Sequence, residues 1–556
     1  MSLRHASGRC FYMYVRSKRT ALAGTLIALL VLAGVIVNKH NLAIYTASLD
    51  ARAFNIGVVG TVKDIEPARA LSDAEKLISS AIYESLVYYD EKSGEIKPLL
   101  ADNWTYSKDG KCLTIKLKKN IKFSNGKTVT AQYVKAAWEN NFSNAADWYS
   151  VSLFLPITGA KERVAGKKQE ISGIQVVDDK TLKLYFVKPN AVFVSMLTNP
   201  IFNVVNIEEK EVFGTGPFVL KDKKENGLVL LKNEHYHRGM PRLSALNITV
   251  YSDAESAYKD YQAGKLDYLD MVPLSEIKNI KKNLAYKGLF INQPLLETYS
   301  LGFNNSREPY AQDYQLRRAL NYAIDRKAIN DSVFGGAYLT LKGVVPSGAP
   351  GYSSHMRGYS YNPEKARQLL EKAGYPEGQG LPLLTLSYNG DPGHREVAEA
   401  VALQLGKLGI QVQTLSMEWN YYQKQVAARS MSFFRIGWQA DYLDADSFLY
   451  SLHHSKQMGI SNYVGYQNPR VDKLLDQSRS QMNNKEERFK LLNRAEQIII
   501  DDAPCLWLFQ KQTTKLISKQ VNALQVNPLN QIDWYKVELK KLTAEESKNQ
   551  SGSKKI

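Results

Sequence analysis

The chain has 556 residues, a hydrophobic content of 44% and an aromatic content of 10%. A chain of this length is too long to fold around one hydrophobic core, and its composition excludes a largely disordered chain. We therefore expect about two to four structural units. The formal net charge is +17, but part of it lies in the basic residues 4–19 and in the lysine-rich tail from residue 540. Without a long basic stripe between them, the charge favours a solvated surface facing anionic lipid or wall polymers over a nucleic-acid site.

The first predicted element is the uncharged segment 21–37, ALAGTLIALLVLAGVIV, which follows the basic segment 1–20. Its length is at the short end of a membrane span, so it indicates either a signal peptide or an uncleaved anchor, with everything after Asn38 outside the cytoplasm. The run 32–35 resembles a lipoprotein cleavage box with Val35 in place of the lipidated cysteine, and Cys10 lies upstream. We therefore expect a single-pass anchor in the cell membrane, followed by a linker over 38–52.

Strand signals dominate the next part of the chain. Residues 54–59 are predicted to form a strand, and 75–87 a helix with its apolar side chains on one face. Alternation over 112–117, after a turn at 108–110, predicts another strand, and Asn125-Gly126 marks a tight turn. Further strand patterns lie at 173–177, 181–186, 219–220 and 228–231.

Helical patterns dominate the second half, at 315–330, 363–373 and 396–408. Asn362-Pro363 is a helix start, and Gly374 with Pro376 ends the same helix. This alternation of helices and strands, with strand-rich insertions, indicates a mixed α/β chain of more than one lobe. Two exported cysteines, Cys112 and Cys505, could pair, but two cysteines make no disulfide framework, and buried thiols are favoured.

Three aspartates lie in the segment 437–449, GWQADYLDADSFL. Asp444 and Asp446 fit turns or helix N-termini, where carboxylates accept backbone hydrogen bonds. Asp441 lies beside Trp438 and Tyr442, where an unpaired carboxylate would be costly to desolvate and requires a cationic partner. From the local residues alone, an internal Lys or Arg is favoured over the ammonium of a ligand.

Six blocks, taken in order, resemble the signature blocks of the extracellular peptide-binding proteins of ABC transporters, and most of all their oligopeptide-binding branch. The resemblance extends from about residue 54 to about residue 539. The blocks are residues 99–131, 214–220, 261–273, 301–329, 362–378 and 437–449.

The resemblance implies an α/β fold: a two-lobed, periplasmic-binding-protein-like clamp (type II, cluster C) with an extra domain in the first lobe. We expect the core of the first lobe over residues 53–95, 205–293 and 521–539, with the extra domain at 96–204. The second lobe is expected over 294–520, and residues 540–556 form a tail that we expect to be disordered.

In the oligopeptide binders that this chain resembles, the aspartate after a Trp-x-Ala block receives the α-ammonium of the peptide, and Asp441 holds that place. Every free peptide has this ammonium, so a carboxylate in a closed cleft reads it independently of sequence. The segment 435–439, with Arg435, Gly437, Trp438 and Gln439, should form a strand whose exposed backbone pairs with an extended peptide.

Four further residues match positions of similar proteins. Arg435 and His394 stand where those proteins supply cations near the C-terminal end of the ligand, although Arg435 could pair with a core acid and His394 could cap a helix. Trp419 and Tyr299 match aromatic positions that line the cleft, and both also fit an ordinary core.

The resemblance implies an extracytoplasmic receptor that captures oligopeptides by their termini and backbone and delivers them to an ABC importer. Its partners would be the peptide and the permease subunits, with no nucleic acid, and we expect a monomer without a cofactor. The alternatives are a nickel or metal-chelate receptor of the same fold, or a receptor that senses a peptide signal. A metal site would use His235 and His237, which share a face if they lie on a strand, and His453 with His454. Similar proteins have a surface turn at the first pair, and adjacent histidines usually point apart, so we expect no metal site. No motif of a nucleophile, phosphate loop or zinc protease occurs, so we expect no enzyme.

Overall fold

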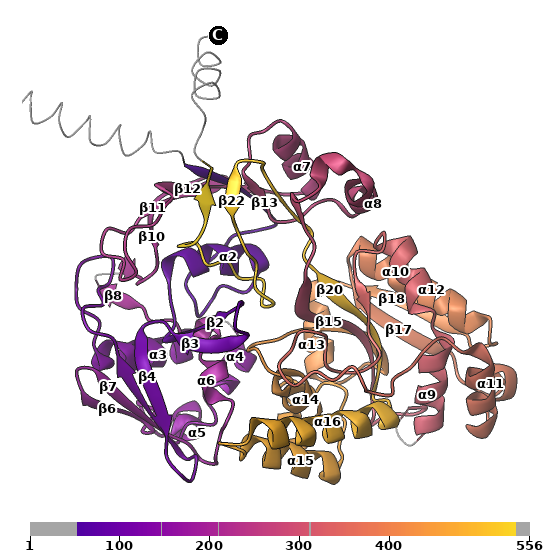
Figure 1. The fold of residues 1–556 in the computed structure, drawn as a ribbon. Coiled ribbons are helices and arrows are strands. Elements are labelled where there is room, and N and C mark those ends of the chain that lie inside the picture. Colours follow the sequence, from indigo (N-terminus) through magenta and orange to yellow (C-terminus); the bar gives the residue numbers. More distant parts are fainter. Residues whose placement is uncertain (1–52, 146, 209–210, 311–312, 541–556) are drawn as a thin grey trace, which may run out of the picture.

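The computed structural model describes residues 53–145, 147–208, 211–310 and 313–540. It is a mixed α/β fold in two lobes, and each lobe is built on a large sheet (Figure 1). The sheet of the first lobe has the order β10-β11-β12-β1-β13-β21-β14, and that of the second lobe β16-β20-β15-β19-β17-β18. A four-stranded sheet, β4-β5-β7-β6, forms the extra domain beside the first lobe. Figure 1 shows this domain facing helices α14 to α16 of the second lobe.

The first lobe is organised around strand β1, which pairs in parallel with β12 and β13. Its alternate residues Phe54, Ile56 and Val58 are fully buried, as the predicted strand requires. The strands of this sheet are β1 (Phe54–Val59), β10 (Phe218–Lys224), β11 (Gly227–Lys232), β12 (Ala245–Tyr251), β13 (Tyr268–Leu269), β14 (Phe290–Ile291) and β21 (Lys515–Ile517). Helices α7 (Ala254–Gln262) and α8 (Leu274–Lys282) belong to the same lobe.

Helix α2 (Asp73–Ile82) positions residues of the first lobe toward the second. Ser72 and Glu75 close its N-terminus with a reciprocal capping box. The helix is shorter than the predicted 75–87, because Tyr83 is extended and the chain then enters the hairpin of β2 (Val87–Asp90) and β3 (Glu95–Pro98).

The extra domain packs its helices around an aromatic core in which Trp138, Phe154, Phe193 and Phe202 are fully buried. The ring centroids of Trp138 and Phe202 are 5.5 Å apart. Its strands are β4 (Ala101–Tyr106), β5 (Cys112–Leu117), β6 (Ile174–Asp178) and β7 (Thr181–Tyr185), and its helices α3 (Ala131–Asn144), α4 (Trp148–Ser152), α5 (Ala160–Val164) and α6 (Phe193–Met196). The short hairpin of β8 (Asn206–Glu208) and β9 (Glu211–Phe213) follows.

The second lobe covers its sheet with helices. The predicted helix 315–330 is two helices, α9 (Tyr314–Ala323) and α10 (Arg326–Val333), because Ile324 is extended and Asp325 caps a new start. The other helices are α11 (Pro363–Lys372), α12 (Pro392–Gly406), α13 (Trp419–Ala427), α14 (Asp446–His453), α15 (Pro469–Arg479) and α16 (Lys485–Asp502). The strands are β15 (Pro294–Phe303), β16 (Leu339–Thr340), β17 (Leu384–Asn389), β18 (Val412–Met417), β19 (Phe433–Gln439) and β20 (Cys505–Gln512).

Two chain segments connect the lobes, and they are hydrogen-bonded to each other. The first leads from β14 to β15 and the second from β20 to β21. The Thr513 amide donates to the Gln293 carbonyl at 2.8 Å, and the Gln293 amide donates to the Thr513 hydroxyl at 2.9 Å. Strand β21 lies in the sheet of the first lobe, before the expected boundary at residue 520. Its sheet membership favours a boundary between Gln512 and Lys515. The short pair β22 (Val521–Ala523) and β23 (Glu538–Leu539) completes the first lobe.

Cys112 and Cys505 are both free, as favoured from the sequence. The predicted anchor 21–37, the linker 38–52 and most of the tail lie outside the described residues. Among the described residues, no helix has the length and apolarity needed to span a membrane.

Candidate functional site

Strand β19 carries most of the predicted site and has one unpaired edge. Residues 433–439 pair antiparallel with β15 along their whole length. On the other side, parallel pairing with β17 reaches only Phe433 and Phe434. Among the described residues, no strand pairs with the 435–439 part of this edge. The predicted strand is confirmed, and its outer edge over residues 435–439 is without a strand partner in the described part of the chain.

The backbone directions along β19 follow from one hydrogen bond, in which the Ala440 amide donates to Leu296 of β15 at 2.8 Å. Because main-chain groups alternate between the two edges of a strand, those of Arg435, Gly437 and Gln439 face the open edge. The hydroxyl of Tyr422 donates to the Arg435 carbonyl, in agreement with this direction. The main-chain groups of Gly437 and Gln439 are therefore positioned to bind an extended segment.

Asp441 follows the open end of this strand. The Tyr149 hydroxyl of the extra domain donates to its carboxylate at 2.6 Å, and its own amide donates to Ser447 Oγ at 3.1 Å. No described Lys, Arg or His nitrogen lies within 4.0 Å of the carboxylate. Burial raises the pKa of Asp441 to about 7, against the opposing influence of the Tyr149 hydrogen bond and the Lys76 charge. An internal cationic partner, which the local sequence favoured, is absent from the described part of the chain.

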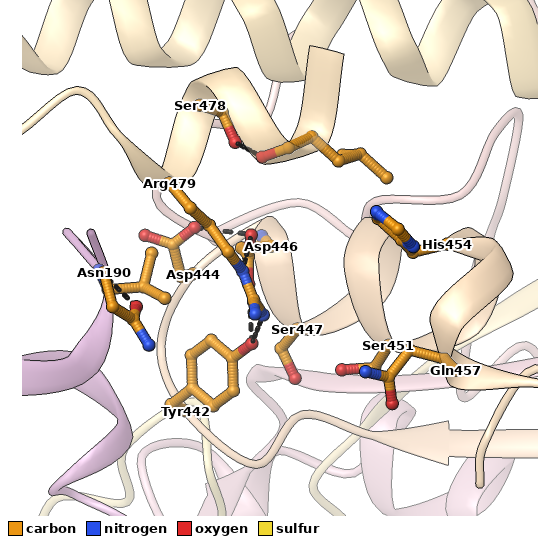
Figure 2. A network of polar contacts seen from close by, with 12 residues as sticks. Asn190, Tyr442, Asp444, Asp446, Ser447, Ser451, His454, Gln457, Ser478 and Arg479 are labelled. Carbon is orange, nitrogen blue, oxygen red and sulfur yellow. Dashed lines mark hydrogen bonds and ion pairs between the residues drawn. The ribbon is translucent and has the colours of Figure 1, made fainter. Parts of the chain in front are cut away.

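The other two aspartates of the segment are paired inside the second lobe (Figure 2). Asp446 is fully buried and lies 2.7 Å from Arg479 Nη2, and Tyr442 also donates to it at 2.7 Å. Asp444 accepts from Arg488 Nη1 at 2.9 Å and from the Asp446 amide at 2.9 Å. Asp444 accepts a backbone hydrogen bond before the helix, as predicted, and Asp446 is the first residue of α14, where its carboxylate binds side chains and caps no backbone group. Each also has an arginine partner, which was not predicted.

At the other end of the open edge lies Arg435, which also has no carboxylate partner among the described residues. Its guanidinium carbon lies 4.9 Å from the ring centroid of Tyr299, and its Nε has no described acceptor. A Cβ atom on Gly437 would lie 2.7 Å from Arg435 Nη2. Because Gly437 has no side chain, the Arg435 guanidinium can lie over it, pointing along the strand in the direction of Asp441.

Arg435 lies over the ring of Tyr299, which in turn packs against His394. Tyr299 is 1% exposed, and its ring centroid lies 5.4 Å from that of His394. Burial and the charge of Arg435 lower the pKa of His394 to about 3. At neutral pH the imidazole is therefore uncharged, and of the two predicted cations Arg435 carries the charge. Nearby, Lys511 is paired with Glu297 at 2.5 Å.

The two predicted tryptophans lie differently. Trp438 packs edge-on against Tyr149, with ring centroids 4.9 Å apart, and its Nε1 donates to the Ser447 carbonyl at 3.0 Å. Trp419 is 48% exposed at the start of α13 and stacks on Tyr422. Trp438 therefore joins the surroundings of Asp441, whereas Trp419 reaches the strand only through Tyr422.

Three residues outside the predicted set reach the site from the first lobe and the extra domain. Tyr149 binds the Asp441 carboxylate, Asn199 donates to the Asp441 carbonyl at 3.1 Å, and Lys76 of α2 donates to Gln439 Oε1 at 2.9 Å. None lies in a motif, because each owes its place to tertiary packing. The open edge of β19 thus lies where the two lobes meet.

The four histidines of the metal alternative make separate contacts. His235 and His237 lie in a turn and not in a strand: His235 is exposed, and His237 Nε2 lies 2.7 Å from the buried Glu84. His454 lies between Asp472 and Asp476 at 3.5 Å from each, and His453 contacts the Phe448 carbonyl. Among the described residues, no group of three or more His, Cys, Asp or Glu side chains could hold a metal ion.

Residues 95–459 match the model of the bacterial extracellular solute-binding proteins, family 5 (middle part). The oligopeptide-binding protein OppA of Bacillus subtilis is 30% identical over 438 residues, covering 74% of this chain and 79% of its own length. The heme-binding protein A of Haemophilus influenzae is 29% identical over 454 residues, covering 77% and 81%. The solved structure of the Escherichia coli murein tripeptide binding protein MppA has a TM-score of 0.72 at 27% identity, covering 88% of this chain and 99% of its own.

Proposed function

The chain belongs to the bacterial extracellular solute-binding proteins of family 5, and we propose that it captures oligopeptides outside the cytoplasm and delivers them to an ABC importer. One observation carries the proposal: an open strand edge has a carboxylate, Asp441, at one end and a guanidinium, Arg435, toward the other, and neither has an ion-pair partner among the described residues. An extended peptide with free termini offers the complementary arrangement of ammonium, backbone and carboxylate.

The direction of the peptide follows from the charges. Asp441 comes after the C-terminal end of β19, so a peptide with its ammonium on Asp441 runs antiparallel to β19. Its carboxylate then points toward Arg435, whose guanidinium lies along the strand over Gly437. Side chains contribute less than the termini and the backbone, which favours a receptor for many sequences over an enzyme with one substrate.

The site draws on both lobes, so peptide binding is coupled to their closure. Asp441 and Gln439 belong to the second lobe, Tyr149 to the extra domain and Lys76 to the first lobe. A ligand that contacts all three favours the closed arrangement and shifts the population toward it. X-ray scattering of the exported part should show a smaller radius of gyration with saturating peptide, and identical curves would contradict this coupling.

The segment 21–37 is proposed as the membrane anchor, which would hold the receptor beside its permease partners. Its 17 uncharged residues follow five cations, an arrangement that retains the N-terminus in the cytoplasm. Fractionation of cells tests this. The receptor should sediment with membranes, and a soluble form that begins between residues 48 and 53 would show cleavage instead.

The decisive experiment combines Asp441→Asn with N-acetylated peptides, measured by calorimetry. The substitution keeps the shape and removes the charge, so affinity for a free peptide should fall by about 2–5 kcal/mol, the usual cost of breaking a buried charge pair. An N-acetylated peptide lacks the ammonium, so it should bind the unchanged protein weakly and lose little further affinity in the variant. Equal losses for free and acetylated peptides would return Asp441 to a structural role.

A further inference from the structure

Lys76 is a charged residue of the first lobe that contacts the site strand. It lies half-buried on α2, and its ammonium donates to the side-chain amide oxygen of Gln439 at 2.9 Å. No Asp or Glu oxygen of the described chain lies within 4.0 Å of this ammonium. A neutral amide is a weaker partner for an ammonium than a carboxylate, which forms a charge-assisted hydrogen bond. An anion beside the open edge of β19 would therefore bind the Lys76 ammonium more strongly than the Gln439 amide does.

Lys76 also lines a cavity of about 480 Å³ in the first lobe. One face of α2 forms a wall of this cavity through Lys76 and Ser80, one helical turn apart, and Tyr83 follows directly after the helix. Other walls are the β2–β3 hairpin and the segment around Asp533. Two of the acids there have partners: Glu84 is bound by Tyr236 and His237, and Asp533 by Arg238. The third, Glu91, lies exposed on the β2–β3 hairpin and has no described ion-pair partner. The cavity is therefore large enough for a side chain, and its free charge at the β19 side is positive.

The register of a bound peptide decides which of its side chains reaches Lys76. Asp441 lies two residues beyond the end of β19, where the chain bends. A peptide that pairs with the open edge and reaches Asp441 with its ammonium directs the nitrogen of its first residue toward β19, and the third residue does the same. These odd residues lie opposite Gln439 or Gly437, whose main-chain groups face the open edge. Opposite residues of an antiparallel pair place their side chains on the same face. An odd-numbered peptide residue opposite Gln439 therefore directs its side chain to the face where Gln439 meets Lys76.

We propose that Lys76 is a specificity-determining residue that selects peptides with an acidic side chain at their first or third residue. The inference rests on the proposed function, because it requires a peptide with its ammonium on Asp441. In the complex, the peptide carboxylate displaces the Gln439 amide from the Lys76 ammonium and directs its side chain toward the cavity. The second residue points to the other face, where no described lysine contacts β19, so its charge is not selected.

The test uses alanine tetrapeptides with Glu or Gln at residue 1, 2 or 3, titrated into the exported chain at low salt. The measured quantity at each position is the ratio of the two dissociation constants. We expect Glu to bind at least about fivefold tighter than Gln at residue 1 or 3, equal binding at residue 2, and a preference that decreases as salt screens the pair. Lys76→Met should abolish the preference. The ratio removes any effect of this variant on Asp441, which alters Glu and Gln peptides alike.

Lys92→Met is the matched control, because Lys92 lines the same cavity from the exposed hairpin and makes no described contact with β19. It should keep the full preference. Equal Glu and Gln affinities at residues 1 and 3, a preference at residue 2 alone, or a preference that survives Lys76→Met would overturn the role of Lys76 and leave the proposed function standing. If no tetrapeptide binds the unchanged protein, the proposed function fails, and the role of Lys76 fails with it.

Discussion

Asp441 and Asp446 belong to one short segment of the second lobe, yet they have opposite surroundings. Asp446 is fully buried and bound by Arg479 and Tyr442, and although burial disfavours its charge, Arg479 holds its pKa below the usual value. Asp441 has a hydroxyl as its side-chain partner, and burial raises its pKa to about 7. The fold itself supplies the cationic partner of Asp446. For Asp441 that partner would have to come from a bound ligand.

The largest effect should come from breaking the internal pair. Asp446→Asn leaves the Arg479 guanidinium buried without its counter-charge, which should lower the free energy of unfolding by about 3–5 kcal/mol. Thermal unfolding of the ligand-free protein measures this. In the same assay Asp441→Asn should leave the melting temperature unchanged or slightly raised. A large loss of stability in Asp441→Asn would remove the distinction between the two aspartates.

Arg479→Met in the Asp446→Asn background sharpens the test. It removes the orphaned charge, so the double variant should recover part of the stability lost in the single variant. A double variant that is less stable than the single one would mean that Arg479 packs mainly against Tyr450 and not against Asp446.

A smaller effect is expected for the two cations Arg435 and Lys511, which differ in the same way as the two aspartates. Arg435 has no described carboxylate partner, whereas Lys511 is bound by Glu297. Arg435→Gln should therefore weaken peptides with a free C-terminus by about 1.5–3 kcal/mol, the usual contribution of a hydrogen bond to a charged group. C-amidated peptides should be affected much less. Lys511→Met should lower stability without distinguishing acid from amide, and an equal loss for both peptide types in Arg435→Gln would exclude carboxylate binding.

The raised pKa of Asp441 predicts a pH dependence. The ammonium binds the ionised carboxylate, which the empty site holds only above about pH 7. Affinity should therefore fall about tenfold for each pH unit below 7, and binding should release a proton. In the ligand-free protein the sign is opposite. The raised pKa stabilises the fold fully below the ordinary value of 3.8, and this contribution is lost as the pH rises through 7. Asp441→Asn should show neither dependence, and a pH-independent affinity from pH 5 to 8 in the unchanged protein would contradict the assignment.

The sequence predicted those parts of the site that belong to one continuous segment. The strand 435–439 and the place of Asp441 after it depend on neighbours in the chain, and the resemblance assigned them. The space that Gly437 leaves for the Arg435 guanidinium was not predicted. The two-lobed fold followed from the ordered blocks in the same way. By contrast, nothing near residue 441 indicates that its cationic partner is missing, because this depends on where Arg435, Arg479 and Arg488 lie in the folded chain.

Contacts between distant segments could not be predicted. Tyr149 and Lys76 are separated from their partners by 292 and 363 residues. The partner of His237 was equally out of reach, because its Nε2 lies 2.7 Å from Glu84, 153 residues away in the chain. Predicting one continuous helix over 315–330 was a local error, since Asp325 is a helix-capping residue that is visible in the sequence.

The smallest effect expected is that of Tyr149→Phe, and it tests how Asp441 is kept ready in the empty site. The Tyr149 hydroxyl is the side-chain group that binds this carboxylate, and its hydrogen bond opposes the rise in the pKa of Asp441. Without the hydroxyl, the pKa of Asp441 should rise further, so the pH at which peptide affinity begins to fall should shift upward. Above that pH the carboxylate is ionised in both proteins, and the loss of affinity should be only about 0.5–1.5 kcal/mol, the usual net value of one hydrogen bond. The ring of Tyr149 stays against Trp438 in the variant, so the packing around the site is retained.

Calorimetry from pH 6 to 9 separates the two contributions: a displaced pH profile with a small loss at high pH fits a hydroxyl that holds the carboxylate ionised. A uniform loss at every pH would show instead that Tyr149 contacts the peptide directly and takes no part in setting the charge of Asp441.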